Sequence, residues 1–258
     1  MGAYILCKVR RAQAPYYIDS IGLHIYSIEE LCYYICQNLP LLDQTILNEG
    51  LAAWLQTELG LTRLGQRLHQ LIREEFAVRD YILPILKEIN YLNHVEFRDL
   101  EANLARQESQ PQSIRLKMKG DALFSHEKYI KAIETYKSAM EGRQEANLGI
   151  QFQGEVCNNM GCAYARLFQM EEACDCFWRA YEILHTQITL KSYLFAIYMR
   201  DGEEAYGSAA DRLGVDPATR EEMDREIAQV QVPQAPSEEE LEEKLAEWTG
   251  AYHRNTGM

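Results

Sequence analysis

Cysteine is the residue type with the clearest potential for chemistry in this sequence, because four thiolates can close a tetrahedral zinc site. Four of the seven cysteines lie in the second half of the chain, as Cys157, Cys162, Cys174 and Cys176. Residues two apart on a helix point about 200° away from each other, so Cys174 and Cys176 could share one ion only by breaking a helix. Cys32 and Cys36 share a helical face, but the sequence places no further ligand beside them. We therefore expect structural thiols that pack as small apolar residues, and neither a metal site nor a cofactor.

The other residue types used in catalysis follow no recognisable motif. The six histidines stand apart from metal-binding patterns and from nucleophiles. The sequence contains no Gly-rich phosphate loop, no Gly-x-Ser-x-Gly elbow and no His-Glu-x-x-His. Adjacent carboxylates such as Glu171-Glu172 fall in predicted helices, where neighbouring side chains diverge. We therefore predict that the protein is not an enzyme and name no catalytic residue.

Charge and hydropathy narrow the range of partners. The 258 residues carry a formal net charge of −13, and residues 201–258 alone hold 15 acidic and 5 basic side chains. An acidic chain without a broad basic stripe is poorly suited to nucleic acid, whose affinity comes largely from neutralised phosphates. The longest apolar run, Tyr193 to Met199, is far shorter than the ~20 residues that cross a bilayer, so we expect no membrane partner. The start of the chain lacks the basic-then-apolar order of an export signal, and an odd number of cysteines favours reduced thiols. The expected location is cytoplasmic.

The elements that would position functional residues are mostly helices. Between Ser27 and Leu184 glycine and proline are sparse, and apolar residues recur every three or four positions, which predicts an all-α protein. A Ser-x-x-Glu box predicts a helix that begins at Ser27. Further helices are expected at about 45–59, 61–74, 77–90 and 93–108. Before them, Tyr4 to Val9 and Gly22 to Tyr26 are rich in β-branched and aromatic residues and predict a small β ribbon.

An internal repeat is the sharpest signal in the sequence. Four positions have a residue of the same kind 41 positions later. The first copy consists of Gly120, Ala132, Tyr136 and Ala139, and their counterparts in the second copy are Gly161, Ala173, Phe177 and Ala180. The second copy also has Tyr164 where the family described below has Tyr. This pattern resembles the tetratricopeptide repeat (TPR), in which small residues allow two helices of a hairpin to approach while aromatic residues fill the space beside them. The resemblance implies TPR-like helical hairpins in a short α-solenoid, with Gly120 against Ala132 and Gly161 against Ala173.

The match to the TPR pattern has departures. The first copy has Leu116 where the family has Trp, and Lys119 where the family has Leu. The 41-residue offset is seven residues longer than the ~34-residue family unit. We expect Gly142 to end one helix and the next helix to start early, near Glu145. Residues 188–213 read as a degenerate third repeat, followed by a capping helix at about 217–230.

The predicted organisation has three parts. Residues 1–110 form a helical N-terminal domain with a small β ribbon, residues 111–230 form the TPR-like repeat domain, and residues 231–258 form a Pro-containing linker and an acidic amphipathic helix. That last helix carries six Glu between 238 and 247, and an apolar stripe of Leu241, Leu245, Trp248 and Tyr252. The stripe could dock on the repeats of the same chain or on another protein.

The TPR resemblance also implies a function and a site. TPR proteins hold an extended peptide or a partner helix on the concave face made by the first helix of each repeat. By register, the residues on that face are Lys117, Asp121, Phe124, Asn158, Asn159, Cys162 and Arg166. One TPR subfamily grips a C-terminal carboxylate with Lys, Asn and Arg; only Lys117 and Asn159 match its pattern, and Asp121 would repel the carboxylate. We therefore expect a peptide groove rather than a carboxylate clamp, with solvated charges as the alternative interpretation.

The segment from Ile25 to Ile35 resembles the leading segment of TPR-containing proteins from Gram-positive bacteria, which implies a bacterial protein and no particular activity. We predict a non-enzymatic scaffold or adaptor that binds a peptide or helix of another protein. Two alternatives stay open. The N-terminal domain could be regulatory or catalytic with the repeats used for targeting, or the chain could be a structural subunit of a larger assembly.

Overall fold

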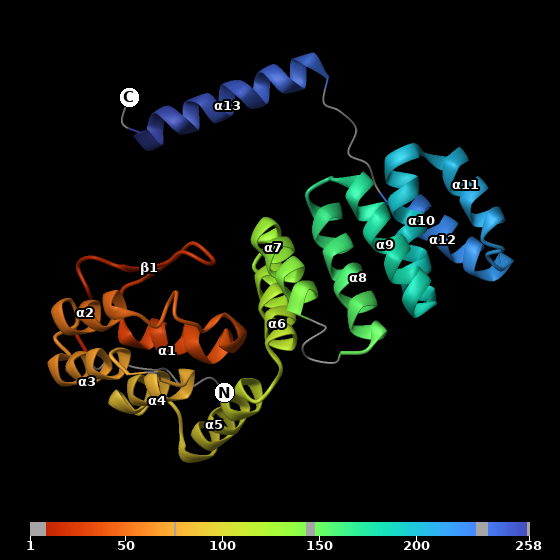
Figure 1. Ribbon diagram of the computed structural model, residues 1–258. Helices are drawn as coiled ribbons and strands as arrows, with labels where there is room; N and C mark the ends of the chain where they lie inside the picture. The colour runs from red at the N-terminus through yellow and green to blue at the C-terminus, as the bar shows by residue number, and fades with distance from the viewer. Residues whose placement is uncertain (1–8, 75, 143–147, 231–236, 257–258) are drawn as a thin grey trace. The chain divides into compact units, whose positions relative to one another are not determined.

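A computed structural model describes residues 9–74, 76–142, 148–230 and 237–256, with side chains in the last segment described for residues 237 and 240–249 (Figure 1). These residues form thirteen α-helices, one short 3-10 helix and one two-stranded sheet. The prediction of an all-α protein is confirmed. The chain divides into two compact units, Met1–Tyr206 and Gly207–Met258. The predicted boundaries at residues 110 and 230 stay predictions.

Residues 9–108, which we call the first part of the chain, pack short strands and helices around one apolar core. Its elements are β1 (Tyr16–Ile18), β2 (Leu23–Ile25), α1 (Ile28–Gln37), η1 (Leu39–Leu41), α2 (Glu49–Thr57), α3 (Thr62–Ile72), α4 (Val78–Glu88) and α5 (His94–Glu108). Buried residues from Ala12 to Leu104 form a single cluster, with Tyr34 and Tyr81 among its largest fully buried side chains. The amphipathic periodicity of the sequence thus places one face of each helix in this core.

The β ribbon differs from the prediction in one strand. β1 and β2 pair antiparallel, with Tyr16 opposite Ile25. We expected Tyr4 to Val9 as the partner of the second strand, but Tyr4 to Lys8 lie outside the described residues, and Val9 is not in a strand. Gly22 explains the choice of partner, since its φ of +72° closes the tight turn that joins β2 to the strand directly before it.

Helix starts follow local capping. The Oγ of Ser27 accepts a hydrogen bond from the Glu30 N–H at 3.1 Å, which confirms the predicted start of α1. Asn93 and Glu96 form a complete capping box at the start of α5. Asp216 caps the α12 helix (Pro217–Gln229) through the Thr219 N–H at 2.9 Å.

The second part of the chain consists of helices joined as hairpins, α6 (Gln112–Ser125) with α7 (Tyr129–Glu141) and α8 (Ile150–Arg166) with α9 (Met170–Leu184), followed by α10 (Gln187–Asp201) and α11 (Glu203–Arg212). From α6 to α10 each helix contacts the next one in sequence (Figure 1). The connection from α10 to α11 passes through Gly202, which has a φ of +86°.

The first two hairpins match residue for residue at the 41-residue offset. Their turns place Glu127 and Phe168 at the same point, with φ of +59° and +58°. The Lys128 N–H donates to the Leu123 carbonyl at 2.9 Å, and the equivalent Gln169 N–H donates to the Tyr164 carbonyl at 3.0 Å. The sequence repeat therefore corresponds to a repeated backbone geometry.

Packing inside the hairpins brings an aromatic ring against each repeat glycine. A Cβ built on Gly120 would lie 2.4 Å from Cε1 of Tyr136, and one on Gly161 would lie 2.7 Å from the Phe177 ring. The atoms nearest to an added Cβ therefore belong to the aromatic rings, and the expected approach of Gly120 to Ala132 and of Gly161 to Ala173 stays a prediction. The rings approach this closely because glycine has no side chain there. The other small residues of the repeat are buried nearby in the same helices: Ala132, Ala139, Ala173 and Ala180.

The connection between the hairpins differs in length from the prediction. Gly142 caps α7, as expected. The next helix begins at Ile150 with Gly149 as its N-cap, later than the expected start near Glu145, which lies outside the described residues. Part of the difference between the 41-residue offset and the ~34-residue family unit lies in α8, which has 17 residues where α6 has 14.

Three polar contacts and one apolar contact join the first part of the chain to the α6–α7 hairpin. Lys119 pairs with Asp43, and Lys131 Nζ lies 2.8 Å from Oδ2 of Asp19. Nε2 of His126 lies 2.6 Å from Oδ1 of Asn38. Leu41 of η1 belongs to one buried cluster with residues of three repeat helices, namely Leu123, Ala132, Tyr136 and Val156. The pair with Asp43 accounts for Lys119 at a position where the TPR pattern has Leu, because its neighbour here is a carboxylate.

Candidate functional site

The seven residues predicted to line a binding surface come from two helices in contact. Lys117, Asp121 and Phe124 lie on α6, and the other four, Asn158, Asn159, Cys162 and Arg166, lie on α8. Asp121 and Asn159 meet directly, since Nδ2 of Asn159 donates to Oδ1 of Asp121 at 2.8 Å. The structure therefore brings together part of the predicted set.

Asp121 is the centre of a polar cluster, which we call the Asp121 cluster and define as Lys117, Asp121, Tyr136, Glu155 and Asn159. The hydroxyl of Tyr136 donates to Oδ1 of Asp121 at 2.7 Å. Nζ of Lys117 lies 3.3 Å from Oδ2 of Asp121 and 3.6 Å from Oε2 of Glu155. The carboxylate of Asp121 thus joins α6, α7 and α8, and its two oxygens are already engaged within the protein. This is a structural role that the sequence did not predict.

Tyr136 belongs to this cluster although the sequence indicated only a packing residue. Its ring is fully buried, and burial followed by the hydrogen bond to Asp121 raises the pKa of its hydroxyl. The phenol therefore stays protonated and acts as a donor. The sequence held a signal: Tyr136 and Asp121 become Phe177 and Cys162 in the second copy, so the donor and its acceptor are lost together.

The remaining predicted residues have different surroundings. The ring of Phe124 meets that of Tyr129 edge to face, with centroids 5.4 Å apart. The Oδ1 atom of Asn158 is buried and makes no hydrogen bond among the described residues. Cys162 is half-buried, and burial raises the pKa of its thiol while Arg166 partly offsets the effect. Arg166 itself is exposed. Nδ2 of Asn158 donates to Oδ1 of Asn159 at 3.5 Å, and Arg166 is the one exposed member of the set.

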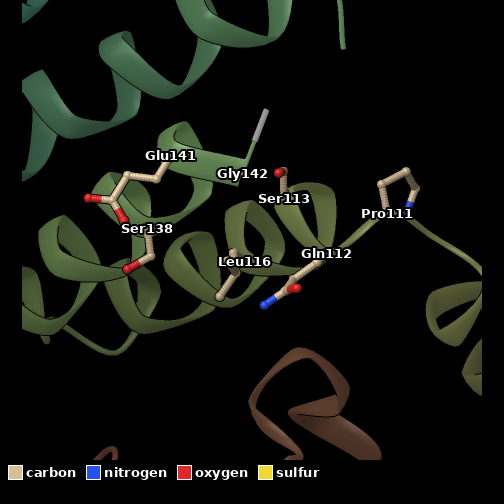
Figure 2. Close-up of a pocket in the computed structure, with 7 residues that line it drawn as sticks. All are labelled: Pro111, Gln112, Ser113, Leu116, Ser138, Glu141 and Gly142. Carbon is tan, nitrogen blue, oxygen red and sulfur yellow. The ribbon is translucent and has the colours of Figure 1, made fainter. Parts of the chain in front are cut away.

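A cavity of about 550 Å³ lies at the other end of the α6–α7 hairpin (Figure 2). Its lining consists of Pro111, Gln112, Ser113, Leu116, Ser138, Glu141 and Gly142. Figure 2 shows Gln112 and Leu116 on the first helix, with Ser138 and Glu141 on the second. Glu141 is the one ionisable group in the described lining, and no histidine or lysine stands beside either serine there.

The described cysteines are free thiols, and most of them are buried. Among the described residues six free thiols are present, four of them buried. Burial raises the pKa of Cys176 to about 12, with a further contribution from the nearby Cys157. In the described part of the chain, no three His, Cys, Asp or Glu side chains gather in a way that could hold a metal ion. These thiols pack as apolar side chains there.

The acidic helix α13 (Glu238–Thr256) presents its apolar stripe to solvent. The exposed fractions are 44% for Leu241, 49% for Leu245 and 62% for Trp248, and the side chain of Tyr252 lies outside the described set. Ser237 and Glu240 form a capping box at the start of this helix, since the Ser237 N–H donates to Oε2 of Glu240 at 2.9 Å and the Glu240 N–H donates to Ser237 Oγ at 3.3 Å.

Each described helix is too short or too polar to cross a membrane. Comparison with protein-family models, with curated proteins and with solved structures finds no match to this chain.

Proposed function

We propose that the protein is a non-enzymatic adaptor in which α6 to α9 form two TPR-like hairpins and α10 and α11 form a degenerate third. The observation that carries the repeat assignment is the match of the two turns at Glu127 and Phe168, with the same φ and the same backbone hydrogen bonds. The glycine-to-ring contacts inside each hairpin support it further, since that close approach is the physical basis of the TPR pattern.

The proposed binding surface is the exposed side of α6 and α8 beside the Asp121 cluster. Arg166 offers a fork of donors for a carboxylate or backbone carbonyl. Asn158, once its side chain rotates outward, offers an amide to the backbone of an extended peptide. Phe124 offers a half-buried ring to an apolar side chain.

Asp121 argues against a carboxylate clamp at this surface. Its negative charge stays on α6 and is only partly balanced by Lys117, which is shared with Glu155. A partner that ends in a free carboxylate would be repelled there. The surface fits an internal peptide segment or a helix better.

The experiment is quantitative affinity capture from an extract of the native cell with the full chain as bait. The binding variant is Asn158→Ala with Arg166→Ala, because Asn159→Ala would break the bond to Asp121 and confuse binding with stability. The matched control is Arg179→Ala, which removes an exposed arginine from α9. A second bait ends at Val230 and lacks α13.

Loss of partners from the double variant alone supports the α6–α8 surface. Loss only on truncation moves the binding function to α13 and its exposed stripe. If every partner survives both changes, the proposal fails and the first part of the chain becomes the place where partners bind.

A further inference from the structure

A second cavity, of about 730 Å³, lies between the β ribbon, α1, the start of the loop after α4 and the end of α6. Its size is within the range of ~300–1,000 Å³ typical of small-molecule sites. The walls come from four separate parts of the chain, and none of the residues proposed to bind a partner protein lines it. The cavity is therefore distinct from the proposed adaptor surface.

Three tyrosines supply much of the wall: Tyr33 and Tyr34 from α1, and Tyr91 from the segment between α4 and α5. Tyr34 is 2% exposed and Tyr33 is 61% exposed, so the aromatic surface runs from the interior to the mouth. Burial raises the pKa of Tyr91, with smaller contributions from the thiols of Cys36 and Cys32 and from Tyr33. These groups therefore lie close to the Tyr91 ring. Faces of aromatic rings attract cations within about 6 Å.

Besides the tyrosines, the ionisable groups in the described lining are two carboxylates, Glu29 and Glu30, and two imidazoles, His24 and His126. Glu29 is only 9% exposed and Glu30 lies beside it in the first turn of α1. One oxygen of Glu30 accepts the Tyr26 N–H at 2.6 Å, which leaves its other oxygen for a ligand. The described lining contains neither Lys nor Arg; the ammonium of Lys128 comes within 3.8 Å of the Cβ position of Gly22 at the edge. An anionic ligand would meet the carboxylates of Glu29 and Glu30, and the imidazoles of His24 and His126 are the basic groups in the described lining; Nε2 of His126 already lies 2.6 Å from Oδ1 of Asn38.

We propose that this cavity binds a low-molecular-weight organic cation, with its apolar body against the tyrosine rings and its ammonium group beside Glu29 and Glu30. Aromatic rings together with carboxylates recognise such a group by cation–π attraction and by charge-assisted hydrogen bonds. A neutral or acidic molecule of the same shape fills the same volume without either attraction.

The test uses dansylcadaverine, which joins a fluorescent aromatic body to a primary amine, titrated with the full chain. The matched probes are N-pentyl dansylamide, which lacks the amine, and dansyl-6-aminohexanoic acid, which carries a carboxylate instead. We expect saturable binding with a blue-shifted emission for dansylcadaverine, and affinity weaker by about tenfold or more for both matched probes. No saturable signal, or equal affinity for the uncharged probe, would overturn the proposal.

Variants locate the bound probe. Tyr33→Ala removes an exposed ring and leaves the core intact, and we expect it to weaken dansylcadaverine binding by about threefold or more, whereas Tyr33→Phe keeps the ring and the affinity. Phe168→Ala is the matched control, since it removes another exposed aromatic side chain outside the cavity. Equal losses in Tyr33→Ala and Phe168→Ala, or an unchanged affinity in Tyr33→Ala, would place the probe elsewhere and refute the proposal.

Discussion

The side chain of Asn159 donates a 2.8 Å hydrogen bond to Asp121 and so joins the first helices of the two hairpins. The same oxygen of Asp121 accepts the hydroxyl of the buried Tyr136. One carboxylate therefore holds three helices in register. The energetic importance of this arrangement can be measured directly.

Replacement of Asp121 by Ala is expected to lower the free energy of unfolding by about 1–3 kcal/mol, because the Tyr136 hydroxyl is left buried without an acceptor. Urea denaturation followed by circular dichroism measures the change. Asp175→Ala, which removes an exposed carboxylate from α9, serves as the control and should stay within about 0.5 kcal/mol of wild type. The structural role assigned to Asp121 is wrong if the two variants are equally stable.

Gly120→Ala tests the close contact inside the first hairpin. A Cβ at this position would lie 2.4 Å from the Tyr136 ring, and overpacking of this kind costs about 1–3 kcal/mol, more than the ~1 kcal/mol that alanine gains over glycine in a helix. We expect a lower urea midpoint. Gly149→Ala, where the added Cβ has nothing within 4 Å, changes only the N-cap residue of α8 and should lower the midpoint less. A more stable Gly120→Ala protein would contradict the contact.

The Asp43–Lys119 pair makes part of the stability depend on pH. Burial alone would raise the pKa of Asp43, but hydrogen bonds from Lys119 and Thr45 lower it below its ordinary value of 3.8. A carboxyl group whose pKa is lower in the folded state adds stability above its unfolded pKa and loses it as pH falls through the folded pKa. Because both side chains are partly exposed, we expect the pair to contribute no more than about 1 kcal/mol.

The measurement is the free energy of unfolding of wild type and Lys119→Met from pH 7 down to pH 2. The difference between them should be largest at neutral pH and should shrink below pH 3.8 as Asp43 becomes protonated. The reverse trend, with a difference that grows in acid, would rule out this linkage. Lys244→Met, which removes an exposed lysine from α13, is the control.

Glu127 and Phe168, the hairpin-turn residues with positive φ, are positions where we expect glycine to stabilise the protein. Left-handed backbone costs an ordinary residue about 1–2 kcal/mol, and glycine pays no such cost. Phe168 is 79% exposed, so Phe168→Gly loses little packing and should raise the free energy of unfolding by up to about 1 kcal/mol. Glu127→Gly should act in the same direction.

The control for these turns is Glu134→Gly, an exposed position inside α7. Glycine in a helix interior costs about 1 kcal/mol relative to a good helix former, so this variant should be less stable. If all three glycine variants lose stability alike, the left-handed geometry of the turns would not be the controlling factor.

The sequence by itself determined the features that depend on neighbours along the chain. The helix start at Ser27 followed from a cap that acts within four residues, and the caps that the structure shows at Asn93 and Asp216 are equally local. The all-α class and the apolar faces followed from the helical period. The 41-residue repeat predicted which positions pack inside each hairpin, because the same spacing requires the same small and aromatic residues twice.

The tertiary structure alone decided which distant residues meet. Asp121 and Asn159 are separated by 38 positions and Asp43 and Lys119 by 76, and no local pattern pairs them. Such pairs depend on how the helices rotate and stack, which is set by the packing of many buried side chains together. For the same physical reason the groups that line the tyrosine-walled cavity, drawn from four separate segments, could not be assembled from the sequence.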